Sequence, residues 1–142
     1  MLRLSRFALV LMLAATTAAC GGDGNDTPTS PSANVPFETV DITLGTGAEA
    51  TTGRLATVAY AGWLYSTTAS QNKGSQFDAG VFTFTVGTGV IPGFSRGVTG
   101  MRVGGQRRVV IPPEMGYGSA GAPPSIPGNA TLVFDIELRS VQ

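Results

Sequence analysis

The part of the sequence with the clearest chemical character is the stretch VFTFTVGTGVIPGF, residues 81–94. It gathers aromatic and aliphatic side chains on both sides of a glycine-rich turn and carries no charged residue. Apolar side chains beside a turn that bends freely are expected to line a dry pocket. The stretch therefore predicts chemistry that depends on apolar surface and on the exclusion of water.

Residue types that support acid–base, covalent or metal chemistry are scarce in this chain. It has no histidine, which is the commonest general base and the commonest metal ligand. Cys20 is its only cysteine, so neither a disulfide within the chain nor a thiolate cluster for zinc can form. We expect no metal, no cofactor and no covalent intermediate. Nine basic and nine acidic residues balance, which gives no reason to expect nucleic acid as a partner.

Five segments have the alternation of apolar and polar residues that is typical of β-strands, and these must position the pocket. They are residues 37–45, 54–65, 81–87, 106–113 and 130–141. In the last segment the side chains predicted to face inward are Leu132, Phe134, Ile136 and Leu138, and those predicted to face outward are Asp135, Glu137 and Arg139. One buried and one wet face indicate an antiparallel sheet. The polar residues 66–76, STTASQNKGSQ, are predicted to form a loop.

The segment IPGFSRGVTGM, residues 91–101, has the period of a helix. Phe94, Val98 and Met101 fall at i, i+4 and i+7, on one helical face, and Pro92 suits a first turn. Each glycine inside such a helix costs about 1 kcal/mol relative to alanine, so the helix must be stabilised by packing of its apolar face. The whole pattern predicts an α+β domain over residues 35–142, an antiparallel sheet of about five strands wrapped on one short α-helix.

The N-terminus has the pattern of an export signal. Residues 1–19 combine two arginines, an apolar run and small residues, in the layout of a secretory signal peptide. Cys20 follows and resembles the lipidated cysteine of bacterial lipoproteins, although Thr17 stands where leucine is usual. The alternative is an ordinary signal peptide with an incidental cysteine. Residues 20–34 are rich in Gly, Ser, Pro and Thr and are predicted to form a flexible tether. We expect an exported protein, anchored through lipid at Cys20 in the bacterial cell envelope.

Five motifs follow one another along residues 35–142: VAYAGWL, QFDAG, FTFTVGTGVIPGF, GVTGMRVGGQRRVVIPPEMGYG and NATLVFDIEL. Together they resemble the FKBP-type peptidyl-prolyl cis-trans isomerases. The resemblance implies a curled antiparallel sheet around a short helix, in agreement with the residue pattern. It also implies an enzyme that accelerates rotation about X-Pro peptide bonds, here in secreted or envelope proteins. Proline-containing polypeptides are then the expected partners, macrolide inhibitors a candidate ligand class, and a monomer the expected state.

The resemblance also implies the residues of the site. Those expected to take part in catalysis are Tyr60, Asp78, Ile91 and Tyr117. Those expected to bind the substrate are Phe77, Phe82, Val90, Phe94, Ile126 and Phe134. Ile91 would hold a substrate carbonyl through its backbone N–H, and Tyr117 another through its hydroxyl. Asp78 would either orient Tyr60 or lie near the carbonyl carbon of the amide; both alternatives stay open.

Several features depart from the usual pattern of the family. Phe94 stands where tryptophan is usual, so the floor of the pocket loses width and an indole N–H. Only the segment AGV separates Asp78 from Phe82, which leaves no counterpart for an arginine that often neighbours the aspartate. The polar loop after Tyr65 is longer than in minimal members, and Ser125 stands where an apolar residue is frequent. These departures change the shape of the pocket, and they bear mainly on its affinity for macrolide inhibitors.

Three kinds of function are compatible with this pattern. The first is a prolyl isomerase. The second is a binding module or holdase chaperone that kept the pocket without useful turnover, and the third is a structural domain of a surface lipoprotein. The presence of Tyr60, Asp78, Ile91, Tyr117 and Phe134 favours the enzyme over the binding module. A purely structural domain would have no use for an apolar pocket.

Overall fold

The computed structural model describes residues 35–142. Its sheet has five strands: β1 (Glu38–Thr43), β2 (Leu55–Tyr65), β3 (Lys73–Thr85), β4 (Gln106–Ile111) and β5 (Leu132–Val141). One α-helix, α1 (Pro92–Val98), and two short 3₁₀ turns, Ser70–Asn72 and Pro113–Met115, complete the domain. The predicted signal peptide (1–19), the predicted tether (20–34) and Cys20 within it lie outside the described residues.

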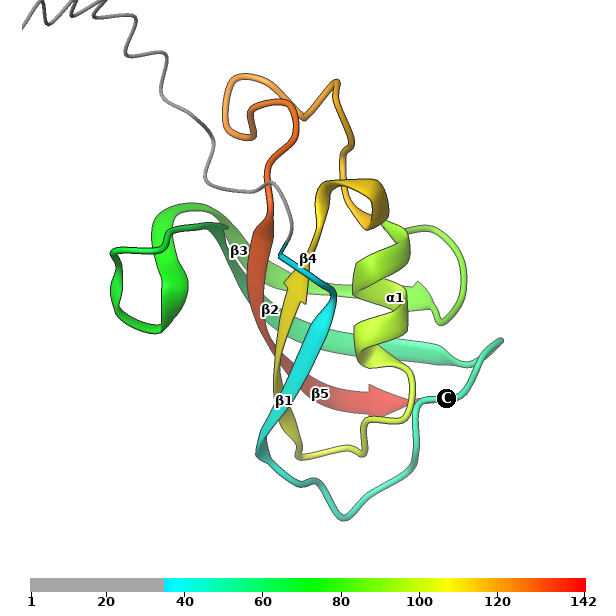
Figure 1. Ribbon diagram of the computed structural model, residues 1–142. Helices are drawn as coiled ribbons and strands as arrows, with labels where there is room; N and C mark the ends of the chain where they lie inside the picture. Colours follow the sequence, from blue (N-terminus) through cyan, green and yellow to red (C-terminus); the bar gives the residue numbers. More distant parts are fainter. Residues whose placement is uncertain (1–34) are drawn as a thin grey trace, which may run out of the picture.

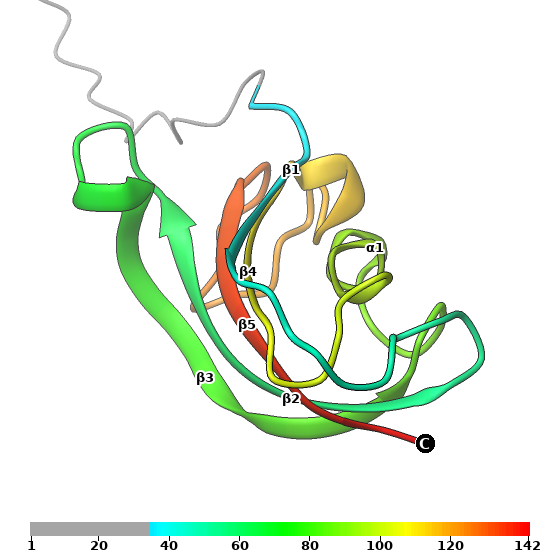
Figure 2. The ribbon, with the colours of Figure 1, turned by 90° about the horizontal axis from the view of Figure 1, so that it is seen from below.

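All neighbouring strands are antiparallel, in the order β1-β4-β5-β2-β3. Figures 1 and 2 show that the sheet curls and that α1 lies within its concave side. The predicted α+β architecture is therefore confirmed. Within the described part of the chain, no helix has the length and hydrophobicity needed to cross a bilayer.

The core lies between the concave face of the sheet and α1. In β5 the four side chains predicted to face inward are all buried, as are Val58 in β2 and Phe84 in β3. Their alternation places apolar side chains on one face because successive residues of a strand point to opposite sides. Val133, which faces outward by this alternation, is also fully buried. The outer face is therefore partly covered.

The prediction of a polar loop over residues 66–76 was wrong at its C-terminal end. Strand β3 begins at Lys73, and Tyr65 of β2 pairs with Lys73 across the turn. The register shifts twice in this region, between Gly62 and Trp63 and between Trp63 and Tyr65. Residues 73–76 form a strand at the sheet edge through main-chain pairing, without burying apolar side chains. Their polar sequence therefore lacks the alternation from which a strand is predicted.

The helix is shorter than its apolar spacing predicts. It ends at Val98, and Met101 is buried only after the chain has turned at Gly100, where φ is +84°. Two glycines of the helix have a packing role, since a Cβ at Gly93 would come within 2.4 Å of Ile111 and one at Gly97 within 2.6 Å of Val109. Glycine is thus needed for α1 to lie directly on β4, which offsets its poor helix propensity.

Two arginines of β4 form ion pairs with carboxylates of the neighbouring strands. Arg107 donates to Asp41 at 2.6 Å and to the carbonyl oxygen of Gly97 at 3.0 Å, which links β1, β4 and the end of α1. Arg108 donates to Asp135 at 2.8 Å. Burial by itself would raise the pKa of Asp135, but the hydrogen bonds from Arg108 and Lys73 lower it below its usual value. This carboxylate is therefore an ionised structural group on the outer face.

Candidate active site

A cavity of about 190 Å³ opens on the concave side of the sheet, between the strands and α1. Its walls come from β2, β3, β5, the turn before α1, α1 itself and the chain after Pro113–Met115. The lining residues are Tyr60, Phe77, Asp78, Phe82, Gly89, Val90, Ile91, Phe94, Tyr117 and Phe134. Segments that are far apart in the sequence therefore meet at one small, mostly aromatic cavity.

The structure brings together every predicted site residue except Ile126. Ile126 is only 4 % exposed and packs in the core. Its backbone exchanges two hydrogen bonds with Ala122, of 2.9 and 3.0 Å, which close a small loop. None of the residues of this loop lines the cavity. Gly89 lines the cavity but was not among the predicted site residues.

Phe94 forms the floor of the cavity and organises its aromatic walls. It is 3 % exposed, and its ring packs edge-to-face against Phe134 at 5.2 Å between centroids. Phe82 lies at 5.6 Å and Tyr60 at 5.9 Å from the same ring. Edge-to-face and tilted pairs of this kind add stability beyond the area they bury. The walls are therefore held by ring–ring contacts around one central phenylalanine.

Tyr60 and Asp78 form the polar pair of the cavity. The hydroxyl of Tyr60 donates to Asp78 Oδ2 at 2.6 Å, and the other carboxylate oxygen accepts the backbone N–H of Ala79 at 2.9 Å. Burial, followed by the hydrogen bond to Asp78, raises the pKa of Tyr60 to about 12. Tyr60 consequently keeps its proton throughout the physiological range. The hydrogen bond favours the alternative in which Asp78 orients Tyr60.

Two hydrogen-bond donors at the cavity have no partner among residues 35–142. They are the backbone N–H of Ile91, directly before α1, and the hydroxyl of Tyr117. Tyr117 is 40 % exposed, so its hydroxyl is open to solvent and to a ligand. An apolar group in the cavity with carbonyl groups on either side would find donors for both.

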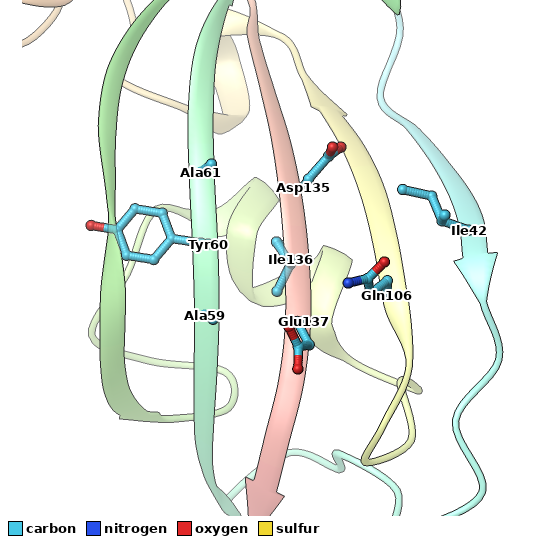
Figure 3. A pocket seen from close by; sticks show the side chains of 8 residues that line it. All are labelled: Ile42, Ala59, Tyr60, Ala61, Gln106, Asp135, Ile136 and Glu137. Carbon is cyan, nitrogen blue, oxygen red and sulfur yellow. The ribbon is translucent and has the colours of Figure 1, made fainter.

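A second hollow, of about 230 Å³, lies on the outer face of the sheet. Figure 3 shows its lining side chains, which come from four neighbouring strands and include Ile42, Ala59, Ala61 and Glu137. Asp135, which also lines it, is already paired with Arg108 and Lys73, and the ring of Tyr60 packs on the opposite face. This hollow is larger, but it lacks the aromatic floor of the concave cavity, and its lining includes the polar or charged side chains of Gln106, Asp135 and Glu137. We therefore take the concave cavity as the candidate site.

The sequence of this chain is similar to proteins of one known family. The family model described as FKBP-type peptidyl-prolyl cis-trans isomerase matches residues 47–139. The FK506-binding protein of Neisseria meningitidis is 43 % identical over 107 residues, which cover 71 % of this chain and 92 % of that protein. FK506-binding protein 4 of Dictyostelium discoideum is 42 % identical over 119 residues, covering 80 % of this chain.

The same fold occurs in a solved structure. The crystal structure of FkpA from Escherichia coli matches with a TM-score of 0.63 and 34 % sequence identity, over 78 % of this chain and 50 % of that one. The chain thus spans half the length of FkpA, and the match covers 31 % of the Dictyostelium protein.

Proposed function

This chain belongs to the FKBP-type peptidyl-prolyl cis-trans isomerases, and we propose that its concave aromatic cavity accelerates rotation about X-Pro peptide bonds. The observation that carries this proposal is an apolar cavity closed by Phe94. At its edge lie two donors without a partner in the described part of the chain, the Ile91 N–H and the Tyr117 hydroxyl. A proline ring would occupy the aromatic part, and the donors would hold the carbonyl groups beside it.

The reaction needs no proton transfer and no nucleophile. Rotation is opposed by the partial double-bond character of the amide, with a barrier of about 18–20 kcal/mol, so X-Pro bonds exchange in roughly tens to hundreds of seconds. The transition state is a twisted amide that has lost its resonance and part of its charge separation. A water-excluded apolar cavity favours this less polar state over the polarised planar amide. Catalysis therefore depends on surface and shape, in keeping with a chain that lacks histidine.

The residues of the cavity take distinct roles in this proposal. Phe77, Phe82, Val90 and Phe134 form walls around the proline ring. Ile91 and Tyr117 hold substrate carbonyl groups, and Asp78 keeps the Tyr60 hydroxyl in one orientation. Together, shape, desolvation and these hydrogen bonds need to lower the barrier by only about 4 kcal/mol for a thousandfold acceleration.

Exchange spectroscopy by NMR on a short proline peptide tests the proposal directly. Catalytic amounts of the protein should raise the cis–trans exchange rate of the peptide far above its uncatalysed value. FK506 serves as a competitor for the cavity and should suppress this increase. If the peptide binds saturably but exchanges at its uncatalysed rate, the protein is a binding module and the proposed isomerase activity is wrong. No binding at all would leave only a structural domain.

We further propose that the protein acts on secreted or envelope proteins and is anchored through lipid at Cys20. The support is the order of signal-like residues 1–19, Cys20 and a polar tether before the domain. Detergent phase partitioning of the full chain expressed in a bacterium provides the test. The wild-type protein should enter the detergent phase and Cys20→Ala the aqueous phase, whereas Thr17→Leu, which keeps the cysteine, should partition like the wild type. Equal partitioning of wild type and Cys20→Ala would contradict lipidation.

A further inference from the structure

The turn between β3 and α1 carries two of the proposed substrate contacts, Val90 and Ile91. Val86 at its start is hydrogen-bonded to the chain before β2, so it is the second half of the turn that has few hydrogen bonds of its own. Figure 1 shows it curving beside α1. Gly87 and Gly89 have φ values of +101° and +80°, and a Cβ at Gly89 would meet nothing within 4 Å. Within residues 35–142 the backbone N–H groups of residues 89–91 donate no hydrogen bond. A glycine-rich segment with so few internal bonds needs an external group to hold its shape.

Ser95 of α1 contacts both ends of this turn. Its Oγ accepts the N–H of Gly87 at 2.7 Å, and its own N–H donates to the carbonyl oxygen of Ile91 at 3.2 Å. The residue is only 7 % exposed and follows Phe94, the floor of the cavity, directly in the chain. Ser95 therefore links the start of the segment before α1, at Gly87, to the first turn of the helix, which also holds the end of that segment at Ile91.

We propose that Ser95 is a positioning residue, whose hydroxyl sets the place of the Ile91 N–H and of Val90 relative to the aromatic floor. The inference rests on the proposed isomerase function. The backbone bond from Ser95 to Ile91 survives any substitution of the side chain, whereas the bond from Gly87 depends on Oγ. Loss of Oγ would remove the link between Gly87 and α1 and leave the Gly87 N–H without a partner. A carbonyl-binding N–H displaced by about 1 Å is enough to lower catalysis substantially.

Three variants test this role. Ser95→Ala removes the acceptor, and Ser95→Thr retains a hydroxyl oxygen at the same place. Thr99→Val is the matched control. It removes a side-chain hydrogen bond at the C-terminal end of α1, from Thr99 Oγ1 to the Ser95 carbonyl oxygen at 2.9 Å, and leaves the turn before the helix untouched. The readouts are kcat/KM on a proline peptide and the hydrogen-exchange rate of the Gly87 amide, at a temperature where every variant is folded.

Ser95→Ala should lower kcat/KM about tenfold, the equivalent of one hydrogen bond, and should speed exchange of the Gly87 amide by a similar factor. Ser95→Thr should keep most of the wild-type kcat/KM and most of the protection of the Gly87 amide. Thr99→Val should match the wild type in both measurements. Wild-type kcat/KM in Ser95→Ala, or an equal loss in Thr99→Val, would overturn the inference. If Ser95→Ala does not fold, Ser95→Cys takes its place, since sulfur is a weak acceptor of similar size. Faster exchange of the Gly87 amide in Ser95→Cys together with wild-type kcat/KM would overturn the inference.

The two proposals fail in different ways. A wild-type protein without catalysis ends the proposed function, and peptide affinity then replaces kcat/KM as the readout for Ser95. An active wild-type protein with an equally active Ser95→Ala variant ends the inference about Ser95 alone.

Discussion

Replacing Phe134 with alanine is expected to lower the free energy of unfolding by about 3–5 kcal/mol and to reduce kcat/KM about tenfold or more. The ring is 4 % exposed and packs against Phe94 at 5.2 Å and against Phe77 at 5.5 Å. It also lines the concave cavity. Its removal therefore leaves a void in the core and takes away one wall of the proposed proline site. Urea unfolding and NMR exchange of a proline peptide measure the two effects.

Phe84→Ala is the matched control for this prediction. Phe84 is 6 % exposed and packs against Phe82 and Phe94, but it does not line the cavity. It should lose a similar amount of stability while keeping most of the activity of the folded protein. A small domain has only about 5–15 kcal/mol of stability, so Phe134→Leu is a milder variant in case the alanine variant unfolds. Equal activity of Phe134→Leu and Phe84→Ala would place Phe134 in the core alone.

Asp78→Asn is expected to reduce kcat/KM by roughly 10- to 100-fold, the equivalent of a hydrogen bond to a charged group. The side chain of Asp78 is exposed, and its partner Tyr60 is 2.6 Å away. Because exposed polar substitutions seldom change stability by more than about 0.5 kcal/mol, the loss should fall on activity. A large drop in the melting temperature of Asp78→Asn would contradict this separation.

A double-mutant cycle with Tyr60→Phe distinguishes the two roles open to Asp78. If the carboxylate acts by orienting the Tyr60 hydroxyl, the double variant should be no worse than the poorer single variant. Additive losses would instead mean that Asp78 acts on the substrate independently of Tyr60.

The pair also predicts a pH dependence with a definite sign. The pKa of Tyr60 is raised from 10.0 to about 12, chiefly by burial and then by the hydrogen bond to Asp78. The folded state keeps this proton where the unfolded chain has lost it. The free energy of unfolding should therefore be unaffected by this group below pH 10 and should fall as the pH rises from about 10 to about 12. Asp78→Asn should lower the pKa of Tyr60. This pKa is measured from the pH dependence of tyrosinate absorbance, after the absorbance of the Tyr60→Phe variant has been subtracted.

Much of this protein is determined by local sequence. The alternation from Leu132 to Leu138 predicts a half-buried strand, because side chains of a strand alternate between faces whatever the rest of the fold. The aromatic residues around the turn at 87–91 and the absence of histidine point to an apolar site without proton transfer. These conclusions need only residue types and their spacing, and the motifs then supply the positions of nearly all cavity residues.

Other features arise only when distant segments meet. Tyr60 and Asp78 are 18 residues apart, and only pairing of β2 with β3 brings their side chains within 2.6 Å. In the same way, Ile126 satisfies the motif but turns into the core, and Arg107 joins Asp41 from another strand. The role of Ser95 depends on a hydrogen bond across the turn to Gly87. The spacing of apolar residues predicts which side chains are buried. The hydrogen-bond partner of a polar group depends on how strands and helix pack against one another, so only the tertiary structure determines it.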